Sequence, residues 1–160
     1  MPKLWIVGKE LRYSDAALSS GDNRRPAFWN DCYNAQIFDS LEERKDLHFD
    51  GSHAGVFIDW YLGDGDFSYI VGMLMKAPPT DLQGYDLREL PETEAAVIWV
   101  KCKEAAETRT VPFEPIAKAL KEIGRSCAKM KWCADVFHSA RFKEPDESGC
   151  VIVDCYIPLD

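Results

Sequence analysis

Carboxylates bordered by aromatic rings are the residues of this chain best suited to bind a planar organic cation. Asp59 lies between Phe57 and Tyr61 in one apolar segment, and Asp154 precedes Tyr156 by two residues near the C-terminus. An aromatic face attracts a cation by about 0.5–2 kcal/mol, and a neighbouring carboxylate adds to that attraction. The pattern predicts a site for amphipathic, cationic aromatic compounds.

The candidate ligand-binding residues are one carboxylate and six aromatic side chains from several apolar segments. They are Phe57, Asp59, Tyr61, Tyr69, Trp99, Trp132 and Tyr156. Each has a simpler alternative, because aromatic residues in strands usually belong to the core and a strand carboxylate is often solvated. Trp132 could line a groove or cap the core.

A hydrolytic reaction in the same place would need a carboxylate that activates water, with a neighbouring donor. Asp59 with Tyr61, or Asp135 with Trp132, could form such a pair, and Asp59 and Asp135 are therefore the tentative catalytic residues. The sequence shows only that these residue types are present. Motifs for a nucleophilic serine, a phosphate-binding loop or a dinucleotide site are absent from the sequence.

Histidines and cysteines do not form a recognisable metal site, so we expect neither a metal nor a cofactor. The histidines, His48, His53 and His138, lie between the regular segments and are interpreted as surface residues. The six cysteines have no C-x-x-C spacing and lie in apolar segments, which favours buried thiols.

Length and charge limit the class of partner. The chain has 160 residues, which fits one domain, and a formal charge of −8. It has no basic cluster longer than Arg24-Arg25, so direct nucleic-acid binding is not expected. An acidic field mildly favours cationic partners, a protein partner included, although it could serve only solubility. Without a signal-like or membrane-spanning apolar run, we expect a soluble cytoplasmic protein with no membrane contact.

The elements that would position these residues follow from the hydrophobic pattern. Residues 55–62 and 67–76 predict a hairpin joined by the Gly-Asp-Gly-Asp turn at 63–66. Further strands are expected at 4–11, 94–103, 137–143 and 150–159, helices at 27–45 and from 108–112 to about 130, and irregular chain at 46–54 and 77–93.

The order strand, helix, hairpin occurs twice, in residues 4–76 and again in 94–159. We therefore predict an α+β fold of duplicated βαββ modules, forming a large antiparallel sheet with two helices on one face and a ligand cleft on the other. Alternate strand residues share a face. The aliphatic set Val56, Ile58, Trp60 and Leu62 is expected toward the helices, and Phe57, Asp59 and Tyr61 toward the cleft or solvent.

The chain resembles the GyrI-like family, the effector-binding domain of AraC-type and multidrug-sensing transcription regulators, which also occurs as free-standing proteins. The segment Phe67–Met75 (FSYIVGMLM) looks like the family's aromatic-x-Tyr-x-x-Gly-Val strand. Leu90-Pro91 ahead of Ala95–Ile98, the long second helix, Phe28-Trp29 and the closing Asp154–Leu159 segment fit as well. The likeness covers nearly the whole chain, although each motif alone is weak.

This resemblance implies a central cleft that binds amphipathic, often cationic aromatic compounds. Some free-standing members hydrolyse cyclopropane-bearing DNA alkylators. The family often has an aromatic residue where Ala95 stands and a glutamate on the strand after the second helix, near Ser139 here, or at Asp135 if the loop is shorter. Since neither residue is glutamate, catalysis does not transfer directly.

Two functions of different classes follow. The first is a free-standing binder of amphipathic aromatic, multidrug or xenobiotic-type compounds, related to transcription regulation. The alternative is a hydrolase of reactive electrophiles that uses the same cleft.

Overall fold

The computed structural model describes residues 1–14, 16–17, 20–60, 65–103, 113–126 and 131–159. The described chain alternates strands with short helices. In order these are β1 (Leu4–Ser14), α2 (Arg25–Asn34), α3 (Ile37–Glu42), β2 (His48–Ile58), β3 (Asp66–Met75), β4 (Asp86–Leu90), β5 (Ala95–Cys102), α5 (Phe113–Glu122), β6 (Trp132–Phe137), α6 (Ser139–Phe142) and β7 (Val151–Pro158).

The strands form one seven-stranded antiparallel sheet in the order β4-β1-β3-β2-β6-β7-β5. Each half of the chain contributes a strand, a helical segment and two more strands, and the halves meet where β2 pairs with β6. In the first half the sheet order is first, third and second strand (β1-β3-β2). In the second half it is second, third and first strand (β6-β7-β5), which is the mirror image. The predicted α+β fold of paired βαββ modules is confirmed.

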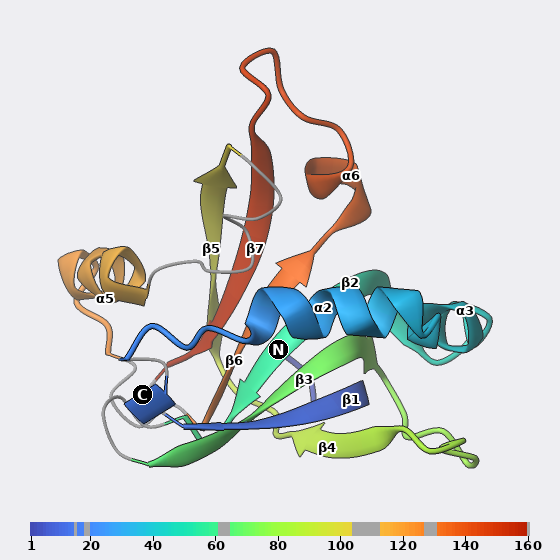
Figure 1. Ribbon diagram of the computed structural model, residues 1–160. Helices are drawn as coiled ribbons and strands as arrows, with labels where there is room; N and C mark the ends of the chain where they lie inside the picture. The colour runs from blue at the N-terminus through green and yellow to red at the C-terminus, as the bar shows by residue number, and fades with distance from the viewer. Residues whose placement is uncertain (15, 18–19, 61–64, 104–112, 127–130, 160) are drawn as a thin grey trace.

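Both helical segments cover the same face of this sheet, as expected. Trp29 of α2, Phe38 of α3 and Leu120 of α5 belong to a single core cluster with residues of the sheet strands. Figure 1 shows α2 and α3 lying across the sheet, with α5 at the far side of the same face. We call this the helix face.

The opposite face is buried because the sheet curls upon itself. The edge strands β4 and β5 are joined by residues 91–94 alone, and the Met1 ammonium group donates to the Thr93 carbonyl over 2.7 Å. Five residue steps span at most about 18 Å, whereas six strand spacings of a flat sheet would total about 29 Å. A cluster that includes Val56, Ile70 and Trp132 fills the curl, and no residue of a described helix belongs to it.

Three segments differ from the sequence-based expectation. The predicted helix 27–45 is broken at Gln36, whose φ of 54° is left-handed, so that α3 starts in a new direction. The strand β4 lies inside the stretch 77–93 that was expected to be irregular. Residues 137–143 are not a strand, because β6 ends at Phe137 and the short helix α6 then takes its place beside β7.

The second helix is shorter than its apolar stripe suggested. It ends at Glu122, and Gly124 follows with φ of 70°, a left-handed geometry that glycine adopts without a Cβ clash. Ile123, which the stripe placed in the core, is 67% exposed. Among the described residues no helix is long and apolar enough to cross a membrane.

Candidate ligand-binding site beneath helix α2

The two faces of the first hairpin are the reverse of the sequence-based assignment. Phe57 is buried in the helix-face cluster, while Val56 and Ile58 belong to the cluster inside the curl. The alternation was correct along β2 as far as Ile58. Beyond the left-handed Asp59, Trp60 packs on the helix-face cluster, as expected, and Leu62 lies outside the described residues. Tyr69 lies beneath α2, where its hydroxyl accepts a hydrogen bond from Trp29, and Phe57 packs against Tyr69 and beneath Arg25. These two predicted ligand residues therefore lie in the layer under the helices.

Helix α2 follows strand β2 in a simple register. Arg25, Trp29 and Tyr33 are spaced by four residues and occupy one side of the helix, so they advance about 6 Å at a time. Alternate residues of β2 advance by nearly the same distance. As a result Arg25 lies over Phe57, Trp29 over Gly55, and Tyr33 beside His53. Pro26, in the first turn, favours the start of the helix there.

Gly55 leaves the space that the middle of this register needs. A Cβ at Gly55 would lie 2.1 Å from Tyr69 Oη and 3.2 Å from a carbon of the Trp29 indole. Trp29 Nε1 donates to Tyr69 Oη over 2.8 Å in this space. The hydroxyl accepts that bond and so retains its own proton for a second acceptor.

Asp135 is the buried carboxylate of this region. It lies opposite Gly55 in the β2–β6 pairing and is 8% exposed. Burial raises the pKa of Asp135 to about 6, although the Cys155 thiol, which donates to Oδ1 over 3.4 Å, and the charge of Arg25 both lower it. Burial, and next the charge of Asp135, also raise the pKa of Tyr69. A carboxylate taken out of water with no full ionic partner is typical of functional sites.

A pocket of about 210 Å³ opens on the helix face beside this buried group. Its lining residues come from both halves of the chain and are Tyr33, Glu42, Gly51, His53, Phe137, Phe142 and Lys143. Phe137 also meets the Trp29 ring edge-on, with centroids 4.9 Å apart. Phe137 lies two residues from Asp135 on the same face of β6, so it connects the pocket lining with Trp29 and the neighbourhood of Asp135. We expected the cleft on the face opposite the helices, whereas this pocket lies on the helix face at the junction of the two halves.

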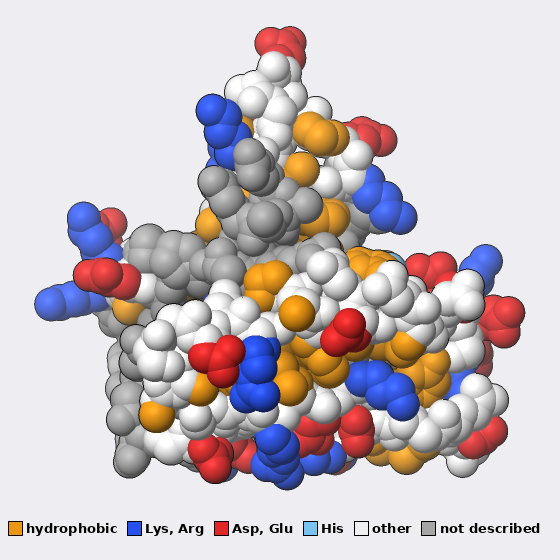
Figure 2. All heavy atoms as spheres, viewed as in Figure 1, with side chains coloured by type: hydrophobic (Ala, Val, Ile, Leu, Met, Phe, Trp, Pro, Cys, Tyr) orange, Lys and Arg blue, Asp and Glu red, His pale blue; other side chains and the backbone are white. Residues whose placement is uncertain are grey.

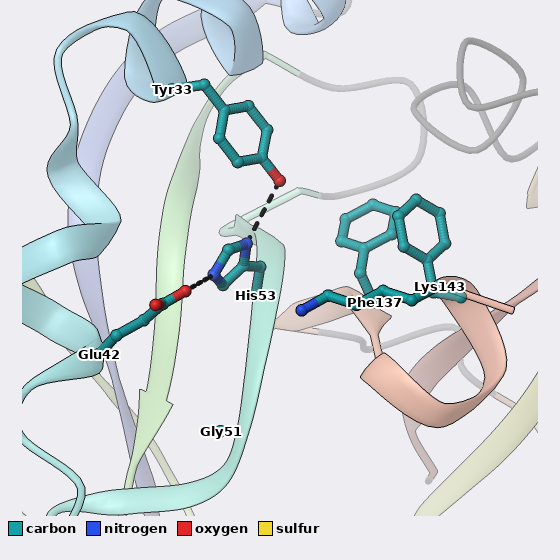
Figure 3. A pocket seen from close by; sticks show the side chains of 7 residues that line it. Tyr33, Glu42, Gly51, His53, Phe137 and Lys143 are labelled. Carbon is teal, nitrogen blue, oxygen red and sulfur yellow. Dashed lines mark hydrogen bonds and ion pairs between the residues drawn. The ribbon is translucent and has the colours of Figure 1, made fainter.

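The pocket contains a hydrogen-bonded chain through His53. Tyr33 Oη lies 3.2 Å from His53 Nδ1, and His53 Nε2 lies 2.8 Å from Glu42 Oε1 (Figure 3). The Phe38 ring stacks on the imidazole at 3.8 Å between centroids and 15° between planes, which fixes its orientation. Burial lowers the pKa of His53, and the hydrogen bond to Glu42 opposes that shift.

Three further predicted residues lie on the other face or its edge. Trp132 is buried inside the curl, with Tyr156 partly buried against the same cluster. Trp99, on edge strand β5, is 64% exposed, and the Arg141 guanidinium lies 5.4 Å from its ring centre. Arg141 pairs through two nitrogens with Asp154, a carboxylate that is 1% exposed. The structure therefore does not bring the six predicted residues that it describes together into one site.

Of the two predicted catalytic pairs, the structure describes both members of Asp135 and Trp132 only, and it does not bring them together. Asp59 follows β2 in a left-handed turn with φ of 58° and is exposed, and its backbone N–H donates to Lys131 O over 2.7 Å. Tyr61 lies outside the described residues. Asp135 and Trp132 are three residues apart on one strand and so point to opposite faces. Asp135 has the raised pKa that the hydrolytic hypothesis required.

Arg25, Tyr33, Glu42 and His53 were missed, and the placement of His53 outside the regular elements was wrong, because it lies on β2. The strand β2 begins at His48, seven residues before the apolar run suggested. Residue 53 lies an even number of positions from Gly55 and Phe57 and so shares their face of β2. A strand predicted to begin earlier would have placed His53 on the helix face. The i, i+4, i+8 spacing of Arg25, Trp29 and Tyr33 was the other available signal. The five cysteines that the structure describes are thiols, as expected, and four are buried.

No protein-family model and no curated protein matches the chain. Solved structures with the same fold do exist. SAV2435 bound to tetraphenylphosphonium is 15% identical with a TM-score of 0.69, covering all of this chain and 90% of that one. A protein of Staphylococcus aureus MU50, provisionally described as a bacterial transcription regulation protein, is 15% identical with a TM-score of 0.67. The match covers 100% of this chain and 94% of that one. An integron cassette protein from the Vibrio cholerae mobile metagenome is 12% identical with a TM-score of 0.56. The match covers 100% of this chain and 92% of that one. The chain shares their fold over its whole length.

Proposed function

We propose that this protein binds lipophilic, cationic aromatic compounds on the helix face, between α2 and the β2–β6 junction, with Asp135 as the counter-ion. The buried Asp135 carboxylate carries the proposal. Among the ion pairs formed by described residues, none includes Asp135. An ionised carboxylate that is removed from water without a partner is destabilising, and a bound cation would relieve that cost.

The surroundings of Asp135 favour a flat cation. Phe57, Tyr69 and Trp29 surround the approach to it with aromatic faces and edges. The protein already has one such cation, because the Arg25 guanidinium lies 5.2 Å from the centre of the Phe57 ring and its charge lowers the pKa of Asp135. A ligand cation would take the position that Arg25 now approaches.

The pocket supplies the way in. Tyr33, Phe137 and Phe142 give it aromatic walls, and Phe137 packs edge-on against Trp29. A bulky aryl cation exceeds the open 210 Å³, so Trp29 and Phe137 swing aside when it enters. Figure 2 shows hydrophobic side chains along the α2 surface with both charge signs interspersed, which suits an amphipathic ligand.

The shared fold supports the same ligand class. SAV2435 has been solved with tetraphenylphosphonium, and a second neighbour is provisionally linked to transcription regulation. Together with the motif resemblance, this supports membership of the GyrI-like group and a role in sensing or sequestering multidrug or xenobiotic-type compounds in the cytoplasm. With a charge of −8 the protein has no footprint for direct nucleic-acid binding, so any regulatory role runs through the ligand or a protein partner.

The test is a calorimetric and Trp-fluorescence titration with tetraphenylphosphonium, and with neutral triphenylphosphine oxide for comparison. We expect tetraphenylphosphonium to bind measurably and the neutral compound not to bind. Asp135→Asn should weaken the affinity for the cation about tenfold or more. Asp59→Asn, an exposed carboxylate, serves as the matched control and should bind as the wild type does. Equal binding of the cation and the neutral compound, or an unchanged affinity in Asp135→Asn, would overturn the proposal.

A further inference from the structure

The chain Glu42–His53–Tyr33 has the arrangement of an acid–base relay. Glu42 can only accept hydrogen bonds as a carboxylate, so its 2.8 Å contact assigns the imidazole proton to Nε2. The other nitrogen, Nδ1, is then the acceptor for the Tyr33 hydroxyl at 3.2 Å. A nucleophile joined to a base, with the base oriented by a third group, is the pattern that activates serine and cysteine in hydrolases.

The fold explains how three separate elements converge on one ring. Tyr33 lies in the last turn of α2 and Glu42 is the last residue of α3. The break at Gln36 redirects α3. As a result the Tyr33 side chain meets Nδ1 of His53 and the Glu42 side chain meets Nε2. The His53 side chain is 19% exposed and is held by the Phe38 ring, so the imidazole is both oriented and reachable from the pocket.

The groups facing His53 keep it a base at neutral pH. Burial lowers its pKa, Glu42 raises it through a hydrogen bond and its charge, and the Lys143 charge lowers it. Tyr33 is a further titratable neighbour among the residues that the structure describes. Figure 3 shows Lys143 extending toward His53 from the opposite side of the pocket, next to Phe137. An ammonium group in this position would stabilise an oxyanion that forms above the Tyr33 hydroxyl.

We propose that this pocket is an acyl-transfer site in which Tyr33 is the nucleophile, His53 the general base, and Lys143 the oxyanion stabiliser. Tyr33 Oη attacks the carbonyl carbon of an ester and its proton passes to His53 Nδ1. The tetrahedral intermediate expels the leaving group, which takes that proton and departs as a phenol or thiol. Water then attacks acyl-Tyr33, again giving a proton to His53, and Tyr33 recovers the proton as the carboxylic acid leaves.

The nucleophile limits the substrate class. An acyl-tyrosine is itself an aryl ester, and the tyrosine hydroxyl has a pKa of about 10. The intermediate expels whichever oxyanion or thiolate is the weaker base, so alkyl esters would return Tyr33 unchanged while aryl esters and thioesters would acylate it. The pocket volume of 210 Å³ equals the share of about seven water molecules, which suits a short acyl chain with one ring against Phe137 and Phe142.

The experiment follows p-nitrophenol release from p-nitrophenyl acetate by stopped flow, with ethyl acetate as the alkyl comparison. We expect a burst approaching one equivalent, an acetyl group on the Tyr33 peptide by mass spectrometry, and no turnover of ethyl acetate. Tyr33→Phe keeps the ring that packs near Trp29 and Phe38, so it should fold normally and abolish the adduct. His48→Gln is the histidine control and should keep the wild-type rate.

Two further variants separate a positioning role from a structural one. His53→Gln should slow acylation by about 100-fold or more, and Glu42→Gln by about tenfold or more while lowering the apparent pKa of the rate profile. In the wild type that profile rises with pH and reaches its plateau earlier than an ordinary histidine would allow. Acetylation found on lysines rather than on Tyr33, or a Tyr33→Phe burst equal to that of the wild type, would overturn the proposal.

Discussion

Asp135 and Gly55 face each other across the β2–β6 pairing, where the two halves of the chain meet. One residue contributes a buried carboxylate and the other contributes no side chain. The space above Gly55 is occupied by the hydrogen-bonded Tyr69 hydroxyl and Trp29 indole. This pairing therefore determines both the charge and the aromatic cover of the proposed binding site.

The first prediction concerns stability and Asp135. Its folded pKa, about 6, lies above the ordinary value of 3.8, so the stability that its protonated form contributes is present at low pH and is lost as pH rises through 6. A two-unit shift corresponds to about 3 kcal/mol. Asp135→Asn should therefore raise the free energy of unfolding by about 1–3 kcal/mol at pH 8 and by much less at pH 4.5. Urea denaturation at both pH values checks this, and an equal effect at both would contradict it.

The second prediction concerns the space above Gly55. Gly55→Ala would place a methyl group 2.1 Å from Tyr69 Oη, and the fully buried tyrosine has little room to withdraw. We expect a loss of about 1–3 kcal/mol of stability from overpacking and the broken Trp29 bond. The double variant Gly55→Ala/Tyr69→Phe removes the clashing oxygen and should recover part of the loss. Thermal unfolding of the wild type, Gly55→Ala and the double variant measures this. No recovery of stability in the double variant would show that the Tyr69 hydroxyl is not the source of the strain.

The third prediction treats Arg25 as a resident cation that competes with the ligand. Arg25→Gln removes a charge that lowers the pKa of Asp135, so that pKa should rise. At pH 8, where Asp135 stays ionised, tetraphenylphosphonium should bind several-fold more tightly. Arg24→Gln is the matched control, because Arg24 lies over Tyr13 instead. Titration calorimetry decides, and weaker binding in Arg25→Gln would show that the guanidinium helps to form the site.

The fourth prediction concerns the ion pair inside the curled face. Asp154 is 1% exposed and depends on Arg141, whose side chain is 33% exposed. Arg141→Met leaves a buried, unpaired carboxylate and should cost about 2–4 kcal/mol, the lower part of that range if water reaches the gap. The double variant Arg141→Met/Asp154→Asn should lose less than Arg141→Met alone. Urea denaturation of both variants and the wild type tests this, and a larger loss in the double variant would contradict it.

The strand-helix-strand-strand order of each half, and hence the α+β class, could be read from the hydrophobic pattern, because period and turn chemistry are local properties. The strand β5 and the alternation along β2 were likewise predictable. The β4 strand was not, because Asp86–Leu90 is short and only half-buried, and its pairing with β1 stabilises it.

The sequence by itself determined which residues share a strand face, but the tertiary structure decided which of the two faces the helices cover. Both faces of the central hairpin are apolar, so the local hydrophobic pattern does not indicate which face packs against the helices. That choice depends on long-range packing, in which α2 brings Arg25, Trp29 and Tyr33 over β2 and the curl of the sheet buries Val56 and Trp132 on the other side. The exposed Asp59 and the buried Asp135 could not be distinguished from spacing, because burial is a property of the assembled fold.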